Sequence, residues 1–127
     1  MNEWRDKMKK GSLLKSFQYA FEGILSTLKT ERNLHVHVIM MTLVIIFGFI
    51  FKINVYEWII CIILFILVIA AEMFNTAIEA TVDMAMPNLH PLAKKAKDVS
   101  AGAVLIIAFG AMIIGLIIFI PKILDIL

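Results

Sequence analysis

Three long stretches without Asp, Glu, Lys or Arg dominate this sequence. They run over residues 33–51, 58–71 and 99–121. As helices, the first and third are long enough to cross the roughly 30 Å hydrocarbon core of a bilayer, and the second crosses it if its ends reach the interface. Backbone polar groups inside a bilayer must be satisfied within the segment, which favours helices. The sequence therefore predicts an all-α membrane protein, a single domain over residues 1–127 with spans at about 33–51, 56–86 and 99–121.

The basic residues are distributed unevenly about these spans. Of the twelve Lys and Arg residues, only Lys52 and Lys122 lie outside the N-terminal segment and the connection between the second and third spans. The positive-inside rule therefore places the N-terminus, the inner end of the second span and the loop 87–98 in the cytoplasm, with the C-terminus outside, in a multi-pass protein of the cell membrane. Residues 52–55 leave room only for a tight outer turn, so we expect a hairpin. The net charge of +2 suits lipid headgroups better than nucleic acid.

The segment before the first span, residues 12–29, carries apolar side chains at helical spacing. These are Leu13, Leu14, Phe17, Ala20, Phe21, Ile24, Leu25 and Leu28, with Lys15, Gln18, Glu22 and Lys29 on the opposite side. The pattern predicts an amphipathic helix lying in the plane of the membrane surface. A plain membrane anchor and a substrate-binding element fit this pattern equally well.

Polar side chains appear suddenly at the inner end of the second span. Glu72, Asn75, Glu79 and Asp83 fall within about one quarter of a helix circumference. A carboxylate near hydrocarbon is costly unless it is neutralised, paired or bound to a cation, and such residues usually mark a functional path. A helix that simply leaves the membrane at Glu72 is the simpler interpretation, but it would not need four polar groups in register.

These residue types suit phosphoryl transfer, which needs a divalent cation, a proton acceptor and basic groups around the phosphates. Glu31 lies at the same membrane surface and, with Glu79, could supply the carboxylates that Mg²⁺ uses beside phosphate oxygens. Glu72, about 10 Å from Glu79 along the helix axis, suits a separate role as general base. No Walker-type phosphate loop is present. The residues alone leave two possibilities, a metal-dependent membrane enzyme and an ion path.

Other features give more limited expectations. The Pro and Lys residues of the loop 87–98 suggest a braced segment able to meet phosphates, although a purely topogenic loop fits as well. His35 and His37 point to different sides of a helix, so we expect packing or headgroup contacts for both. The small residues of the third span predict close helix contacts and a closed symmetric oligomer. Pro121 is expected to end that span.

Four segments resemble the signature of the prokaryotic diacylglycerol kinase family. They are residues 71–79 (AEMFNTAIE), 96–98 (AKD), 16–23 (SFQYAFEG) and 31–33 (ERN). The resemblance implies a homotrimeric bundle of three-span subunits, each with an N-terminal surface helix. It also implies transfer of the γ-phosphate of ATP, with Mg²⁺, to a lipid hydroxyl.

The resemblance implies roles for individual residues. Glu72 matches the general base, with Asn75 in support, and Glu31 and Glu79 match the metal ligands. The positions that match nucleotide contacts are Tyr19, Asn88, Leu89, His90, Lys97 and Asp98.

Two substrate positions depart from the diacylglycerol-specific members, which have an arginine and a serine where this chain has Ser12 and Ala101. Residues 19–23 and 31–33 are instead similar to the undecaprenol kinase branch. The leading hypothesis is therefore a kinase that converts undecaprenol to undecaprenyl phosphate at the cytoplasmic surface. The alternatives are a diacylglycerol kinase that makes phosphatidic acid and, from another class, a small oligomeric ion channel or transporter subunit. The outer half of the second span has no polar side chain beyond Cys61, which does not favour a channel.

Overall fold

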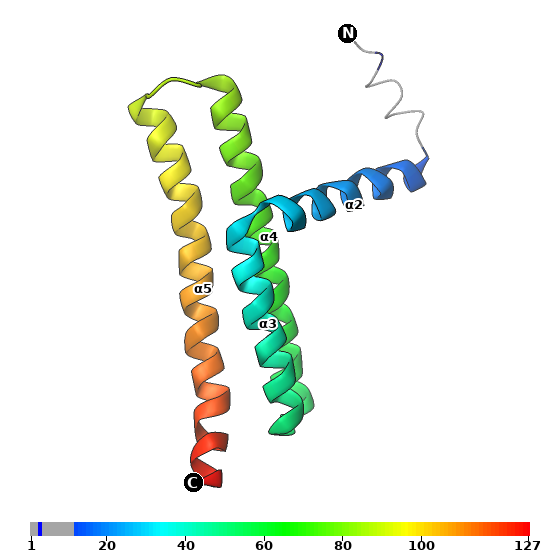
Figure 1. The fold of residues 1–127 in the computed structure, drawn as a ribbon, viewed down its shortest axis with the longest axis vertical. Helices are drawn as coiled ribbons and strands as arrows, with labels where there is room; N and C mark the ends of the chain where they lie inside the picture. Colours follow the sequence, from blue (N-terminus) through cyan, green and yellow to red (C-terminus); the bar gives the residue numbers. More distant parts are fainter. Residues whose placement is uncertain (1–2, 4–11) are drawn as a thin grey trace. The chain divides into compact units, whose positions relative to one another are not determined.

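The computed structural model describes residue 3 and residues 12–127, and every regular element in residues 12–127 is a helix. The helices are α2 (Leu13–Thr30), α3 (Arg32–Ile50), α4 (Val55–Ala85) and α5 (Pro91–Ile126) (Figure 1). The chain divides into two compact units, residues 1–31 and 32–127. The second unit contains three helices that are long and apolar enough to cross a membrane, which confirms the prediction of three helices able to span.

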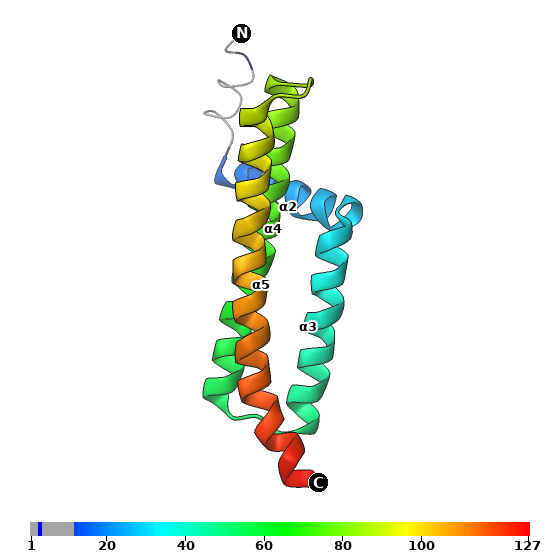
Figure 2. The same cartoon turned by 90° about the vertical axis from the view of Figure 1, so that its left-hand side faces the viewer.

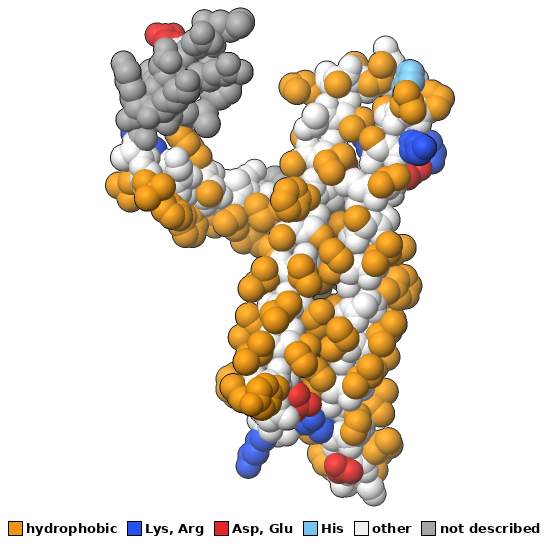
Figure 3. All heavy atoms as spheres, turned by 180° about the vertical axis from the view of Figure 1, so that it is seen from behind, with side chains coloured by type: hydrophobic (Ala, Val, Ile, Leu, Met, Phe, Trp, Pro, Cys, Tyr) orange, Lys and Arg blue, Asp and Glu red, His pale blue; other side chains and the backbone are white. Residues whose placement is uncertain are grey.

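In the second unit, α4 packs against both α3 and α5. Its 31 residues give a helix of about 46 Å at 1.5 Å per residue, longer than the roughly 30 Å of bilayer hydrocarbon. Figure 2 shows α4 and α5 running side by side along most of their length, with α3 joined to α4 at the turn. On the face shown in Figure 3, hydrophobic side chains cover these long helices, and charged side chains lie near their ends.

The α3–α4 turn is tight, as the sequence predicts. Lys52 takes a left-handed backbone conformation with a φ of 52°. Asn54 then caps α4, because its side chain accepts from the Glu57 N–H at 2.9 Å while Glu57 accepts from the Asn54 N–H at 3.0 Å. Gly48 allows Trp58 to pack on α3, since an added Cβ would lie 2.6 Å from Cη2 of that ring.

The same end of the molecule is tied to α5. Lys122 Nζ donates to Glu57 Oε2 at 2.6 Å and to the Ile118 carbonyl at 3.2 Å. Next to this pair, Ile53, Cys61 and Ile118 form a buried cluster. We call residues 48–61 and 118–122 the turn end.

Two sequence-based expectations about α5 are wrong. The predicted loop 87–98 is largely helical, because α5 begins at Pro91, where a proline fixes φ and no N–H is needed. His90 caps it by accepting the Leu92 N–H at Nδ1, 3.1 Å away. Pro121 does not end α5, which continues to Ile126. A proline inside a helix lacks one donor and crowds the carbonyl four residues earlier, but the hydrogen bonds resume after it, with the Leu127 N–H on the Ile123 carbonyl at 3.4 Å.

Candidate active site

The four polar groups predicted to share one face of α4 differ in burial. Glu72 and Asn75 are buried, with 2% and 6% of their surface exposed. Glu79 is half-buried and Asp83 is exposed. Glu72 lies about 26 Å along the helix from Val55, which is near the far edge of a hydrocarbon core measured from the turn. We call residues 72–83 the polar half of α4. Its charged side chains become accessible only toward the C-terminal end of the helix.

The carboxylate of Glu72 contacts a histidine of the neighbouring helix. Its Oε1 lies 3.2 Å from Nε2 of His37, on α3. The expectation of a packing or headgroup role for His37 is therefore wrong. Sequence spacing predicts that His35 and His37 point to different sides of α3, but it does not show which side meets α4. The sequence did carry a signal for this contact. His37 lies one helical turn inside the first span, and Glu72 is a carboxylate near hydrocarbon that needs a partner.

Asn75 connects the buried and the accessible carboxylates. Its Nδ2 donates to Glu79 Oε1 at 3.2 Å. A carboxylate only accepts, so the amide must turn its NH₂ group toward Glu79 and its oxygen away. That oxygen, Oδ1, is buried and has no hydrogen-bond partner within the described part of the chain. Asn75 therefore orients Glu79 and leaves one acceptor open to a donor or a cation.

The α4–α5 connection and the start of α5 hold most of the residues matched to nucleotide contacts. Asn88, Leu89 and His90 are exposed in or beside this connection. Lys97 forms an ion pair with Asp83 of the polar half, and Lys94 pairs with Asp98 at 2.5 Å. Exposed ion pairs contribute only about 0–1 kcal/mol, so phosphate groups could replace the carboxylates as partners of Lys94 and Lys97 at little cost.

The remaining predicted site residues belong to the first unit or to the outer surface of α5. In the first unit, Ser12 precedes α2 with no side-chain cap bond, Tyr19 is exposed, and the N–H of Glu31 bonds the Thr27 carbonyl. Ala101 is exposed on α5, whereas its neighbour Ser100 is buried. Ser100, which sequence reasoning missed, lines an α4–α5 groove together with Asn75 and Lys95.

A magnesium ion fits this donor set only with help from a substrate. Among the described residues, no three His, Cys, Asp or Glu side chains come together to hold a metal. Mg²⁺ usually takes one or two carboxylates and completes its shell with water and phosphate oxygens. Glu79, held by Asn75 and half-exposed, is suited to such a role.

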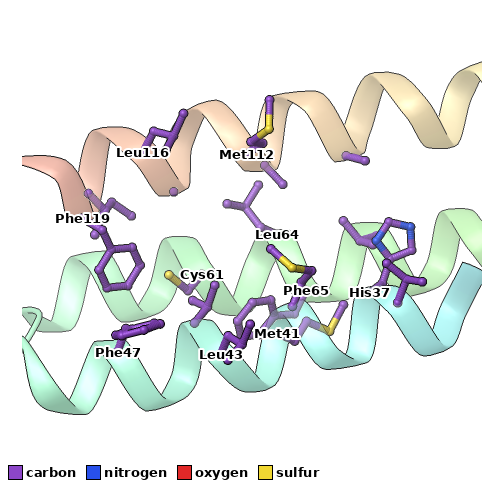
Figure 4. A pocket seen from close by; sticks show the side chains of 18 of the residues that line it. His37, Met41, Leu43, Phe47, Cys61, Leu64, Phe65, Met112, Leu116 and Phe119 are labelled. Atoms are coloured by element: carbon purple, nitrogen blue, oxygen red, sulfur yellow. The ribbon is translucent and has the colours of Figure 1, made fainter.

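An apolar cavity of about 540 Å³ lies between α3, α4 and α5, within the size range of small-molecule sites. Figure 4 shows His37 at one end and Phe47 and Phe119 at the other, with Met41, Phe65 and Met112 between them. Cys61 and His37 are the only cysteine and histidine among the lining residues. The cavity therefore offers hydrocarbon surroundings that lead to the side chain in contact with Glu72.

The fold and the site define a small multi-span membrane protein with a buried carboxylate at the base of a charged helix face. Comparison with known proteins gives the class. The family model "Prokaryotic diacylglycerol kinase" matches residues 18–119. The chain belongs to this family of lipid kinases.

Individual relatives support the assignment. The chain is 46% identical to "Undecaprenol kinase" of Bacillus subtilis over 108 residues, which cover 85% of this chain and 88% of the relative. It is 34% identical to "Diacylglycerol kinase" of Synechocystis sp. over 91% of this chain and 67% of that one. It is also 31% identical to "Diacylglycerol kinase" of Pseudomonas aeruginosa over 72% and 74%. These relatives favour the kinase hypotheses over the channel.

Proposed function

We propose that this protein is an ATP- and Mg²⁺-dependent kinase that phosphorylates undecaprenol to undecaprenyl phosphate at the cytoplasmic membrane surface. The observation that carries the proposal is the 46% identity to an undecaprenol kinase over 85% of this chain, compared with 31–34% for the diacylglycerol kinases described above. The buried carboxylate of Glu72, beside an apolar cavity, is consistent with an acceptor that stays in the bilayer.

In this proposal, Glu72 is the general base. The oxygen of the lipid hydroxyl forms a bond to the γ-phosphorus of ATP, its proton passes to Glu72, and the bond to the β-phosphate oxygen breaks to release ADP. General bases contribute about 10²–10⁴-fold to rates. Because Glu72 is 2% exposed, its carboxylate is screened from bulk water.

The phosphates would be held at the accessible end of the polar half. Glu31 and Glu79 would bind Mg²⁺, which neutralises phosphate charge when bound. Asn75 would fix Glu79 through the 3.2 Å hydrogen bond. The nucleotide contacts would come from Tyr19, Asn88, Leu89, His90, Lys97 and Asp98. Ser12 and Ala101 would border the lipid, and their small side chains offer few groups to the two esters of a diacylglycerol.

The proposal includes a surface helix and a homotrimer. On α2, Leu13, Phe17, Phe21 and Leu25 follow one another every four residues and are all more than half exposed, so an apolar surface such as the bilayer interface would cover them. On α5, an added Cβ at Gly102, Gly110 or Gly115 meets nothing within 4 Å, so these glycines are open to a helix of another copy. The N-terminus and the α4–α5 connection would face the cytoplasm.

The test is ATP-dependent phosphate incorporation by the purified full-length protein into undecaprenol and diacylglycerol in matched mixed micelles. We expect a higher kcat/KM for undecaprenol, because Ser12 and Ala101 offer few donors to the two esters of a diacylglycerol, and only a site built to bond such groups would strongly favour that lipid. Equal or reversed efficiencies would assign diacylglycerol as the substrate, the alternative supported by the names of several relatives.

A further inference from the structure

His37 is the polar side chain that holds the carboxylate of Glu72. Within the described residues, no other side chain is hydrogen-bonded or ion-paired to that carboxylate. Thr76 is close, but its hydroxyl donates to the Glu72 backbone carbonyl at 3.0 Å and leaves the side chain unheld. The orientation of this buried carboxylate therefore depends on a contact between two helices, α3 and α4.

The hydrogen bond between His37 and Glu72 has a defined donor and a defined acceptor. An ionised carboxylate only accepts hydrogen bonds, so Nε2 of His37 must carry a hydrogen, as it does in one neutral tautomer and in the imidazolium. With Oε1 engaged at 3.2 Å, Oε2 is the oxygen left to receive a proton from a substrate. Hydrogen bonds to charged groups are stronger than neutral ones, so this contact restricts the rotation of the carboxylate.

The surroundings offer little to replace the imidazole. His37 lies at one end of the apolar cavity (Figure 4), and the lining also includes Met40, Met41 and Val68. Water in an apolar cavity lacks the two to four polar partners that would fix it there. Loss of the imidazole would therefore leave the Glu72 side chain buried and free to turn.

We propose that His37 is a positioning residue, which fixes the Glu72 carboxylate so that Oε2 faces the lipid hydroxyl. The proposal rests on the proposed function, in which Glu72 takes the proton of that hydroxyl. Since His37 acts through Glu72 and not on either substrate, its loss lowers kcat and leaves the KM values for ATP and lipid nearly unchanged.

Two amides of different length test the idea. In His37→Gln the amide nitrogen reaches about as far as Nε2 of histidine, whereas in His37→Asn the amide stops short of Glu72. We expect His37→Asn and His37→Leu to lower kcat about tenfold or more, with both KM values within about twofold, and His37→Gln to keep most of the wild-type kcat. His35→Leu removes an exposed imidazole two residues away and should leave kcat within about twofold.

A double-substitution cycle separates positioning from a general effect on folding. Glu72→Asp shortens the side chain and draws the carboxylate away from His37, so adding His37→Asn should cost much less than it does in the wild type. Fully additive losses, equal kcat for His37→Gln and His37→Asn, or wild-type kcat for His37→Leu would each overturn the proposal. A wild-type protein that phosphorylates no lipid would instead overturn the proposed function.

Discussion

The two ends of α4 have the same helical backbone but differ in how far their polar groups are paired. At the turn end, Glu57 is paired with Lys122, and the backbone and side chain of Asn54 are both used in the helix cap. In the polar half, Asn75 keeps a buried oxygen without a partner among the described residues, and Glu79 is accessible. The difference indicates that the turn end is built for stability, whereas the polar half leaves bonding capacity for ligands.

The largest effect should come from the polar half. Glu72→Gln keeps the volume of the side chain but cannot accept the proton, so we expect kcat for lipid phosphorylation to fall about 10²–10⁴-fold without loss of fold. The matched control is Glu57→Gln at the turn end, which should retain near-normal kcat at 25 °C. Near-normal turnover by a well-folded Glu72→Gln protein would rule out the general-base role.

The second-largest effect should be on the Mg²⁺ dependence of activity. Glu31→Ala and Glu79→Ala each remove one carboxylate from the proposed Mg²⁺ site, so the Mg²⁺ concentration for half-maximal activity should rise by about tenfold or more. Titration of activity with Mg²⁺ at fixed ATP measures it, and Glu57→Gln should titrate as the wild type does. An unchanged titration curve in both alanine variants would show that these carboxylates do not share a cation.

A stability change of intermediate size is expected at the turn end. Gly48→Ala puts a methyl group 2.6–2.8 Å from two atoms of the Trp58 ring, which should destabilise the protein by about 1–3 kcal/mol. The midpoint of thermal unfolding in detergent should fall while kcat at 25 °C persists. Gly23→Ala, where an added Cβ meets nothing within 4 Å, is the control. Equal shifts in both variants would argue against the contact with Trp58.

The smallest effect concerns the ion pair between α4 and α5. In Glu57→Gln the capping bond to the Asn54 N–H can persist, so the variant isolates the loss of the charge pair. The two side chains are 17% and 26% exposed, and we expect about 1 kcal/mol of destabilisation. Thermal unfolding at low and high salt measures it. A marked fall in kcat at 25 °C for Glu57→Gln, with only a small change in thermal stability, would contradict the division of roles between the turn end and the polar half.

Much of the candidate site can be predicted from the α4 sequence alone. Residues on one helix have a fixed angular relation, so helical spacing by itself places Glu72, Asn75 and Glu79 on one face, and a hydrogen bond joins two of them. The effects of Pro91 and Pro121 on the chain cannot be predicted in the same way. Pro91 and Pro121 both suggest interruptions of helices, yet one begins α5 and the other lies inside it.

The sequence by itself determined the three apolar helices, the tight turn and the shared polar face, because each follows from local length, hydropathy and helical period. Only the tertiary structure decided which side of α3 meets α4, and thus that His37, not His35, reaches Glu72. It also decided that Ser100, one residue from the predicted Ala101, is the buried one. The physical reason is that in a chain apolar on nearly every side, hydropathy does not select the face that packs. That face is set by close contacts such as Trp58 on Gly48.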